Sequence, residues 1–308
     1  MKKILCLVFI ATFIYANNIE TNKESTPTKS INNEQEEFTL TLDWLEQKPK
    51  TITKDFYILQ YLKQDITPDE ALKALSMVKY VSNQIFYAFA KKFKHDETTA
   101  VVQCMQANAK ELINTYDDCI KAGLSLYKAT KLSQVELNEA ILKVKDKYPT
   151  FANKLKILAS SLPFTKTISA SKDDFFDIYL KTGSQFKIDF LNYKLPKKTL
   201  NKIKKDKRVE TLIKYAITNP QLDLLSKSFL GINDTTFNSL TSFFLALNEI
   251  NNENLKQALT YLSNSYKKAY NDYGKNRAIF WKYLITYDKK FLEELSSSNN
   301  FDIYSLYA

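Results

Sequence analysis

Apolar residues recur at helical spacing along most of the chain from residue 38 onwards, and the stretch "SQVELNEAILKV" (133–144) illustrates the pattern. Ser133 and Glu136 have the spacing of a capping box, in which the serine hydroxyl accepts the N3 amide hydrogen and the glutamate reaches back to the N-cap amide. The apolar residues that fall on one face are Leu137, Ala140, Ile141 and Val144. This spacing predicts an amphipathic helix that begins after Ser133.

A second helix is expected after Thr67, in "DITPDEALKALSMVKYVSNQIFYAFAKKF". Thr67 suits the N-cap and Pro68 the first helical position. The apolar positions are Leu72, Leu75 and Val78, and the lysines that complement the negative end of the helix dipole are Lys91, Lys92 and Lys94. The pattern predicts one helix that closes near Lys94. We interpret its aromatic residues, Phe86, Tyr87, Phe89 and Phe93, as packing between helices rather than as ligand contacts.

Two further segments have the start and stop signals of helices. Residues 171–183, "SKDDFFDIYLKTG", start with Ser171 and two acidic residues and reach Gly183, which we expect to form a C-cap. In "NENLKQALTYLSNSYKKAY" (252–270), the apolar residues at helical spacing are Leu255, Ala258, Leu259 and Leu262. Both segments are joined to their neighbours by brief polar stretches.

The composition supports helices over sheets. The 308 residues include only 4 Gly and 7 Pro, whereas tight turns and Gly-rich phosphate loops need residues that reach positive φ. Many short amphipathic helices with brief joints, and no strong strand pattern, predict an all-α fold. They favour a superhelical array of short antiparallel helical pairs over a compact bundle.

The N-terminus has the layout of a secretory signal peptide. Lys2 and Lys3 precede an apolar run that ends before Ala16, and the run is shorter than the 20 or so residues that a membrane span needs. We expect cleavage after residue 16, a periplasmic protein and no stable membrane insertion; an uncleaved N-terminal anchor is the alternative. Residues 17–37 are almost entirely polar, which predicts a disordered tether before a folded region at 38–308.

Charge narrows the classes of partner. The formal charge is +10, and without Lys2, Lys3 and the tether, which has five Glu against two Lys, residues 38–308 carry +11. A basic exported protein favours a polyanion, an acidic cell-wall polymer or a membrane surface. Export argues against nucleic acid. Charge of this size can also serve solubility alone, or follow from low-GC codon usage, which enriches Lys and Asn.

Two cysteines remain if Cys6 leaves with the signal peptide. Thiols pair in an oxidising compartment, and the separation of Cys104 and Cys119 fits two helices of one hairpin with a turn near Asn108 or Asn114. We expect a disulfide; two buried free thiols are the alternative. With a single His and no CxxC spacing, neither a metal site nor a cofactor is expected.

The most basic segment is "KLPKKTLNKIKKDKR" (194–208), in which eight cationic residues stand against Asp206 alone. A helix that begins at Lys197 would place Leu200, Ile203 and Val209 on its inner face. The residues that would then point outward, and that form the candidate binding site, are Lys197, Lys198, Lys204, Lys205 and Arg208. Such a face is either simply solvated or attracts the carboxylates of an acidic cell-wall polymer.

Three stretches together resemble the N-terminal part of soluble lytic murein transglycosylases, particularly the epsilonproteobacterial type. They are "DWLEQKPKTITKDFYILQYLKQ" with the following "ITPDEALKAL", "QCMQANAKELINTYDDCIKAGLSLYKATKLS", and "AIFWKYLITYDKKFLEELSSSNNFDIYSLYA". The likeness spans most of residues 43–308 and lies in the joint order of the segments. It implies a U- or ring-shaped superhelical domain followed by a lysozyme-like catalytic domain. The family cleaves the MurNAc–GlcNAc bond of peptidoglycan and leaves a 1,6-anhydro-MurNAc end.

The catalytic Glu of that family lies in a Glu-Ser-x-Phe motif with a downstream Gly-Leu-Met-Gln segment, and this sequence contains neither. Its only Glu-Ser pair, Glu24 and Ser25, lies in the expected tether. Paired acids such as Asp117 with Asp118 and Asp173 with Asp174 are interpreted as ordinary acids of helix starts. We therefore expect no catalytic residue and no activity of this chain alone. In the family "YSLYA" stands where the superhelical domain meets the catalytic one, so we expect that domain after Ala308.

The resemblance predicts a non-catalytic domain that holds peptidoglycan glycan strands for a lysozyme-like catalytic domain. The rival hypothesis is a free-standing periplasmic scaffold of TPR-like type that binds a protein. A complete enzyme of unrelated chemistry lacks a nucleophile, base and orienting residue that could be assembled from the sequence.

Overall fold

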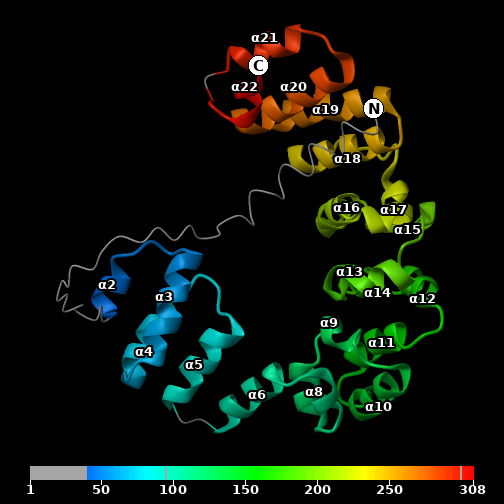
Figure 1. The fold of residues 1–308 in the computed structure, drawn as a ribbon. Helices are drawn as coiled ribbons and strands as arrows, with labels where there is room; N and C mark the ends of the chain where they lie inside the picture. Colours follow the sequence, from blue (N-terminus) through cyan, green and yellow to red (C-terminus); the bar gives the residue numbers. More distant parts are fainter. Residues whose placement is uncertain (1–39, 94–95, 299) are drawn as a thin grey trace, which may run out of the picture. The chain divides into compact units, whose positions relative to one another are not determined.

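The computed structural model describes residues 40–308 except 94–95 and 299, so the predicted signal peptide and tether lie outside the described residues. Leu42–Ala308 forms one compact unit. Within the described ranges every regular element is a helix and no β-strand is present, which confirms the predicted all-α class (Figure 1). None of the described helices is both long enough and apolar enough to cross a membrane.

The helices are short and follow one another closely. The first ten in chain order are α2 (Leu42–Glu46), α3 (Ile52–Lys63), α4 (Pro68–Ser76), α5 (Asn83–Phe93), α6 (Asp96–Gln106), α7 (Ala109–Ile113), α8 (Asp117–Gly123), α9 (Leu126–Ala129), α10 (Gln134–Val144) and α11 (Pro149–Leu158). The next are α12 (Pro163–Ser169), α13 (Lys172–Lys181), α14 (Ser184–Phe190), α15 (Lys197–Ile203), α16 (Arg208–Thr218) and α17 (Asp223–Ser226). The last are α18 (Ser239–Asn251), α19 (Leu255–Lys268), α20 (Asp272–Thr286), α21 (Lys290–Ser296) and α22 (Ile303–Tyr307). Two short 3₁₀ turns, Pro220–Leu222 and Lys227–Phe229, flank α17.

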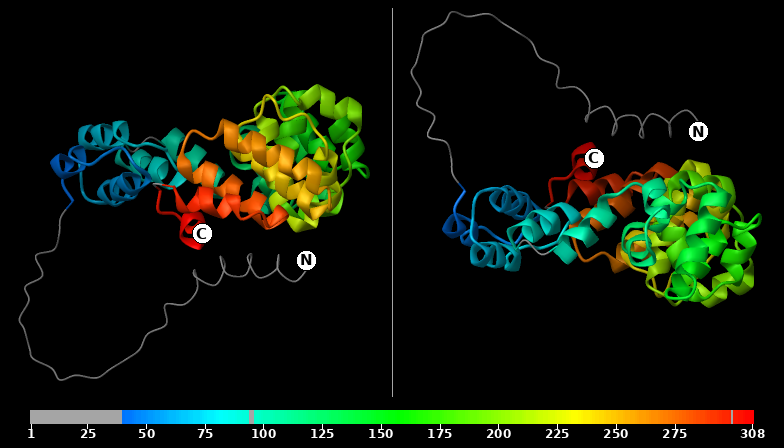
Figure 2. Two further views of the ribbon diagram at one scale, coloured as in Figure 1. Left: turned by 90° about the horizontal axis from the view of Figure 1, so that it is seen from above. Right: turned by 90° about the horizontal axis from the view of Figure 1, so that it is seen from below.

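Packing is mainly between helices that are close in sequence. α3 packs on α5, α6 on α8, α10 on α11, α18 on α19, and α19 on α20. Figure 2 shows α18, α19 and α20 side by side, with α22 against α20. Because each helix has one apolar stripe, a neighbour on that side is what removes the stripe from water.

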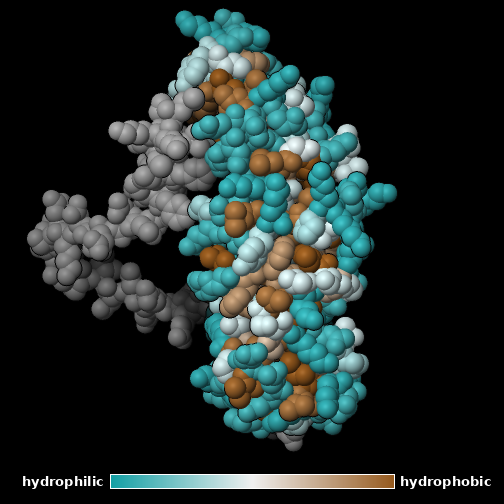
Figure 3. Space-filling model, turned by 90° about the vertical axis from the view of Figure 1, so that its right-hand side faces the viewer, coloured by the Kyte–Doolittle hydropathy of each residue, from teal (hydrophilic) through white to brown (hydrophobic). Residues whose placement is uncertain are grey.

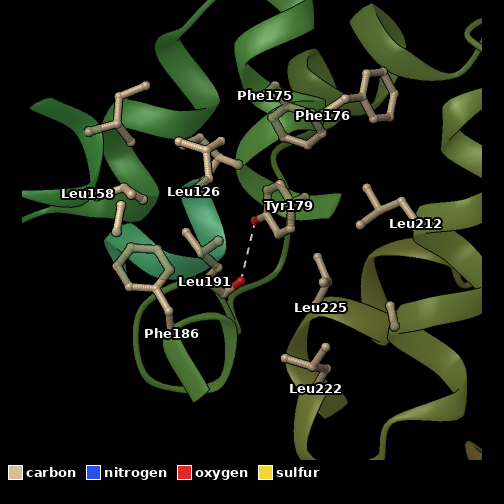
Figure 4. Close-up of a cluster of buried hydrophobic side chains, with 14 of the residues drawn as sticks. Leu126, Leu158, Phe175, Phe176, Tyr179, Phe186, Leu191, Leu212, Leu222 and Leu225 are labelled. Carbon is tan, nitrogen blue, oxygen red and sulfur yellow. Dashed lines mark hydrogen bonds between the residues drawn. The ribbon is translucent and has the colours of Figure 1, made fainter. Parts of the chain in front are cut away.

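One continuous core runs through most of these helices, from Cys104 to Leu262. Three of its largest side chains come from α13, where Phe175, Phe176 and Tyr179 are almost fully buried (Figure 4). Tyr179 donates its hydroxyl hydrogen to the Leu191 carbonyl at 3.3 Å, which satisfies its one polar atom in the core. Burial raises the pKa of Tyr179 far above its ordinary value, so this hydroxyl stays protonated.

The predicted caps of α10 and α13 are confirmed. Ser133 accepts the Glu136 amide hydrogen, the Glu136 carboxylate accepts the Ser133 amide, and the Ser171 hydroxyl accepts the Asp174 amide. The four apolar residues predicted for the inner face of α10 are all buried. In α19, Ala258 and Leu262 are buried as predicted, while Leu255 and Leu259 are half-buried.

The single helix predicted from Pro68 to Lys94 is wrong, although Thr67 does cap its start with a complete capping box. The structure has two helices, α4 and α5, separated by residues 77–82. The buried carboxylate of Asp55 accepts the amide hydrogens of Lys79 at 2.7 Å and Tyr80 at 3.0 Å, so these amides are lost to a helical ladder. A contact between residues 24 positions apart leaves no local signal.

The inner face predicted for this stretch also needs correction. The residues that α4 buries fully are Ala71 and Ala74, whereas Leu72 is about half exposed. Val78 is buried, but it lies in the linker after α4. The aromatic ring of Phe89 packs against Phe93 within α5, with 4.7 Å between ring centroids.

Gly183 does not form the C-cap predicted for it. α13 ends at Lys181, Thr182 takes an extended conformation and donates its hydroxyl hydrogen to the Ile178 carbonyl, and Gly183 becomes the N-cap of α14 with φ −65°. A Cβ at Gly183 would lie 2.9 Å from the Thr130 hydroxyl. The requirement for a small residue here is therefore one of space and not of left-handed backbone.

The expected cysteine pair joins two helices. Cys104 on α6 and Cys119 on α8 form a disulfide, with 5.2 Å between their Cα atoms. The intervening chain contains α7, with Asn108 as its N-cap and Asn114 as its C-cap, so the two predicted turn positions bracket a short helix. One turn after Cys119, Gly123 lies against the backbone of Cys104, where an added Cβ would be 2.0 Å from the Cys104 carbonyl oxygen.

Candidate basic surface

The basic segment 194–208 is attached to the core at three of its residues. Leu195, Thr199 and Ile203 are buried, and the Leu195 amide donates to the Ser228 hydroxyl at 2.7 Å. Lys202 turns back toward the protein and donates to the Ala170 carbonyl. These anchors leave the remaining lysines of the segment at the surface.

The helix predicted to begin at Lys197 does begin there, but it ends at Ile203 instead of continuing toward Arg208. Asp206 is the reason, because its carboxylate accepts the Arg208 amide at 3.0 Å and so opens the next helix, α16. Val209 is buried as predicted, whereas Leu200 is only half-buried. The segment is thus a helix, a basic turn and a helix start.

The prediction that Arg208 points freely outward is wrong. Its guanidinium donates to Asp206 through Nε at 2.9 Å and Nη2 at 2.8 Å, and to Asp173 through Nη2 at 2.7 Å. Its guanidinium carbon lies 4.5 Å from the centre of the Phe176 ring. The hydrogen bonds from Arg208 hold the pKa of Asp206 well below its ordinary value, and Lys172, 3.3 Å away, acts in the same direction. Arg208 therefore links the start of α16 to Asp173 on α13.

The other four predicted residues behave differently. Lys197, Lys198, Lys204 and Lys205 are exposed. Among the described residues none of the four has a salt bridge or a side-chain hydrogen bond partner, and the one acid of the segment is already neutralised by Arg208 and Lys172. We call these four residues the basic surface. Figure 3 views the side on which Figure 1 places α15, where hydrophilic residues predominate and hydrophobic ones form small separate groups.

The acids singled out from the sequence stay at helix starts. Asp117 and Asp118 open α8 and Asp173 and Asp174 lie in the first turn of α13. Lys147 pairs with Asp118 at 2.6 Å, and hydrogen bonds from Lys147 and then Tyr148 lower the pKa of Asp118. Ion pairs of this kind fix the ends of short helices.

Glu249 is the one Glu that is buried in the described part of the chain, and no sequence motif marks it. Its Oε1 accepts the Gly231 amide at 2.7 Å and its Oε2 accepts the Asn254 side-chain amide at 2.8 Å. Both carboxylate oxygens are thus used to hold the loop before α18 and the turn after it. These two hydrogen bonds give Glu249 a structural role that accounts for its burial.

Residues 301–307 expose much of their apolar surface. The most exposed are Phe301, Ile303, Leu306 and Tyr307, whereas Tyr304 packs on Phe280 with 5.4 Å between ring centroids. The last helix, α22, has no buried residue. Exposed apolar side chains in series are typical of a surface that meets a partner.

No cluster of three or more His, Cys, Asp or Glu side chains that could hold a metal ion is found in residues 40–308 outside the gaps at 94–95 and 299. Neither a protein-family model nor a curated protein sequence matches this chain.

Proposed function

We propose that this chain is a non-catalytic, periplasmic peptidoglycan-binding protein, related to the superhelical part of soluble lytic murein transglycosylases. It holds glycan strands for a lysozyme-like catalytic domain, which supplies the acid and base that break the MurNAc–GlcNAc bond. The observation that carries the proposal is the basic surface: four exposed lysines with no acid to neutralise them. The resemblance of residues 43–308 to the family supplies the identity of the polymer.

Peptidoglycan suits such a surface because it carries carboxylates at short intervals, on lactyl groups and on stem peptides. An exposed Lys–carboxylate contact contributes about 0.2–1 kcal/mol, so no single lysine can hold the polymer. Four contacts together can change affinity by about tenfold or more. Exposed charges are screened beyond about 10 Å at 0.1 M salt, and the effect must therefore weaken as salt increases.

The proposal is tested by co-sedimentation with purified sacculi. Replacing Lys197, Lys198, Lys204 and Lys205 by Gln should weaken binding about tenfold at low salt, and the difference should shrink at 0.5 M salt. A matched control removes four exposed, unpaired lysines elsewhere: Lys145, Lys156, Lys166 and Lys256. Binding that both variants lose equally would attribute the effect to net charge and contradict a defined surface.

A protein-binding scaffold of TPR-like type is the second candidate, favoured by the exposed apolar side chains of residues 301–307. It predicts that wild-type protein stays in solution when sacculi are sedimented. Under this alternative, changing Phe301 and Leu306 to Ser would abolish capture of a protein partner, whereas the lysine changes would not.

A further inference from the structure

A cavity of about 420 Å³ lies where the end of α19 and the starts of α18 and α20 meet. This volume falls within the range of small-ligand sites. Lys268 and Arg277 contribute two cationic groups to its wall, and Tyr270 and Tyr273 contribute aromatic rings. Among residues 40–308, apart from the gaps, no carboxylate lines it. The residues that line this cavity therefore favour a ligand with an anionic group and an apolar face that can pack on aromatic rings.

Lys268 is not the group available to such an anion. Its ammonium donates to the Asp234 carbonyl, lies 3.3 Å from the Asp234 carboxylate and donates to the Ser242 hydroxyl at 3.1 Å. The Asp234 side chain is buried, so this pair is an internal tie between α19 and the segment before α18. Arg277 is left as the unneutralised cation of the cavity.

Arg277 has no hydrogen-bond acceptor among the residues that the structure describes. Its Nε is the one buried side-chain nitrogen or oxygen without a hydrogen bond partner among the described residues, and the guanidinium has no salt bridge there either. Its guanidinium carbon lies 4.2 Å from the centre of the Phe243 ring and 5.9 Å from that of Tyr273. Burying a hydrogen-bond donor without an acceptor costs free energy, and the cost is larger when the donor belongs to a charged group.

The electrostatics of Arg277 agree with this geometry. Burial lowers the pKa of Arg277, which Tyr304 and Tyr273 oppose only in part. The lowered pKa means that the surroundings of Arg277 do not supply the negative charge that would stabilise a half-buried cation. A bound carboxylate would supply this negative charge through paired hydrogen bonds from the two terminal nitrogens of the guanidinium, because the buried Nε is closed to the cavity.

The rim of the cavity offers two aromatic rings. Tyr270 is 95% exposed and Tyr273 is 44% exposed. An exposed ring presents a flat apolar face beside a polar hydroxyl, which can pack against the C–H face of a sugar while water reaches the rest. Nothing in the fold requires Tyr270 to be aromatic, because its side chain contacts almost nothing.

We propose that this cavity binds an acidic amino sugar of the muramic acid type, with its lactyl carboxylate on Arg277 and its ring against Tyr270 and Tyr273. The choice of ligand rests on the proposed function, because peptidoglycan is the source of that sugar; the need for a carboxylate rests on Arg277 alone. The cavity would then fix one sugar of a strand that the basic surface attracts by charge.

The test compares two sugars that differ only in the carboxylate-bearing group. N-acetylmuramic acid and N-acetylglucosamine are titrated separately into the full-length protein, and binding is followed by NMR chemical-shift changes. We expect N-acetylmuramic acid to bind at least tenfold more tightly. Arg277→Gln should remove this preference, and Arg277→Lys should restore part of it. Because Arg277 is half-buried, Tyr270→Ala serves as a second variant that leaves the core intact and should weaken binding of both sugars.

The outcomes separate this inference from the proposed function. The wild-type chain could bind sacculi and yet have equal affinity for the two sugars, or Arg277→Gln could keep the preference. Either result contradicts sugar binding in the cavity and leaves the proposed function standing. A preference for N-acetylmuramic acid without sacculus binding supports the cavity and contradicts the proposed function. Loss of binding in Tyr270→Ala together with loss of preference in Arg277→Gln supports the inference directly.

Discussion

Replacing Gly123 by Ala probes how closely α6 and α8 are packed. An added Cβ would lie 2.0 Å from the Cys104 carbonyl oxygen, 2.7 Å from its carbonyl carbon and 2.7 Å from Leu112 Cδ2. Non-bonded carbon contacts are favourable only near 3.5–4.0 Å, so one helix must move. The disulfide to Cys119, one turn earlier on α8, restrains that movement.

The opposing contributions can be compared. Ala favours a helix over Gly by about 1 kcal/mol. Overpacking in a filled core costs about 1–3 kcal/mol, and the upper part of this range, about 2–3 kcal/mol, applies here because the obstacle is backbone, which cannot rotate away. We expect Gly123→Ala to lower the unfolding free energy by a net 1–2 kcal/mol, or roughly five- to thirtyfold in the opening equilibrium.

The assay is hydrogen exchange of the α6 and α8 amides, because a chain of stacked helices can open locally before it unfolds as a whole. Exchange there should accelerate by that factor in Gly123→Ala. Gly183→Ala is the matched control, since an added Cβ there meets the side chains of Thr130 and Tyr127 and touches neither α6 nor α8. We expect it to leave the exchange of the α6 and α8 amides unchanged. Unchanged exchange of α6 and α8 in Gly123→Ala would refute the close packing.

Three further predictions concern the disulfide, pH and activity. Thiol labelling of the denatured, unreduced protein should find neither Cys104 nor Cys119 free, and reduction of their disulfide, which closes a 15-residue loop, should cost about 3 kcal/mol; labelling of both cysteines would disprove the pairing. The pKa of Asp206 is lowered in the folded state, so its carboxylate stabilises the fold above its ordinary pKa of about 3.9 and loses this effect as pH falls toward the folded-state pKa. The loss of melting temperature caused by Asp206→Asn should therefore be largest near pH 7 and shrink below about pH 4. A loss that grows on acidification would contradict this sign. Incubation of the purified chain with sacculi should release no 1,6-anhydromuropeptides by mass spectrometry, and their appearance above a protein-free control would demand an active site.

Local signals predicted the fold most successfully. Ser133 and Glu136, and Ser171 with Asp174, form caps through residues only three positions apart, which a sequence displays directly. The break between α4 and α5 depends instead on Asp55, whose two hydrogen bonds cross 24 and 25 residues. No reading of residues 65–93 alone could reveal it.

The candidate site shows the same difference between local and distant contacts. The exposure of Lys197, Lys198, Lys204 and Lys205 could be predicted, because the buried residues that anchor this segment alternate with them within residues 194–208. The engagement of Arg208 could not, since one of its acceptors is Asp173, 35 residues earlier. Arg277 was missed altogether, because its significance lies in the acceptor that its surroundings lack and not in any motif around it.

The most direct test of peptidoglycan binding is lysine footprinting in the presence of sacculi. The protein is treated briefly with an acetylating reagent at low salt, with and without sacculi, and modification of each lysine is measured by mass spectrometry. Lys197, Lys198, Lys204 and Lys205 should be protected severalfold, whereas Lys145, Lys156 and Lys166, exposed in the same molecule, should react as before. Equal modification of both sets in a sample that co-sediments with sacculi would contradict the assignment of the basic surface, and an absence of co-sedimentation would contradict peptidoglycan binding itself.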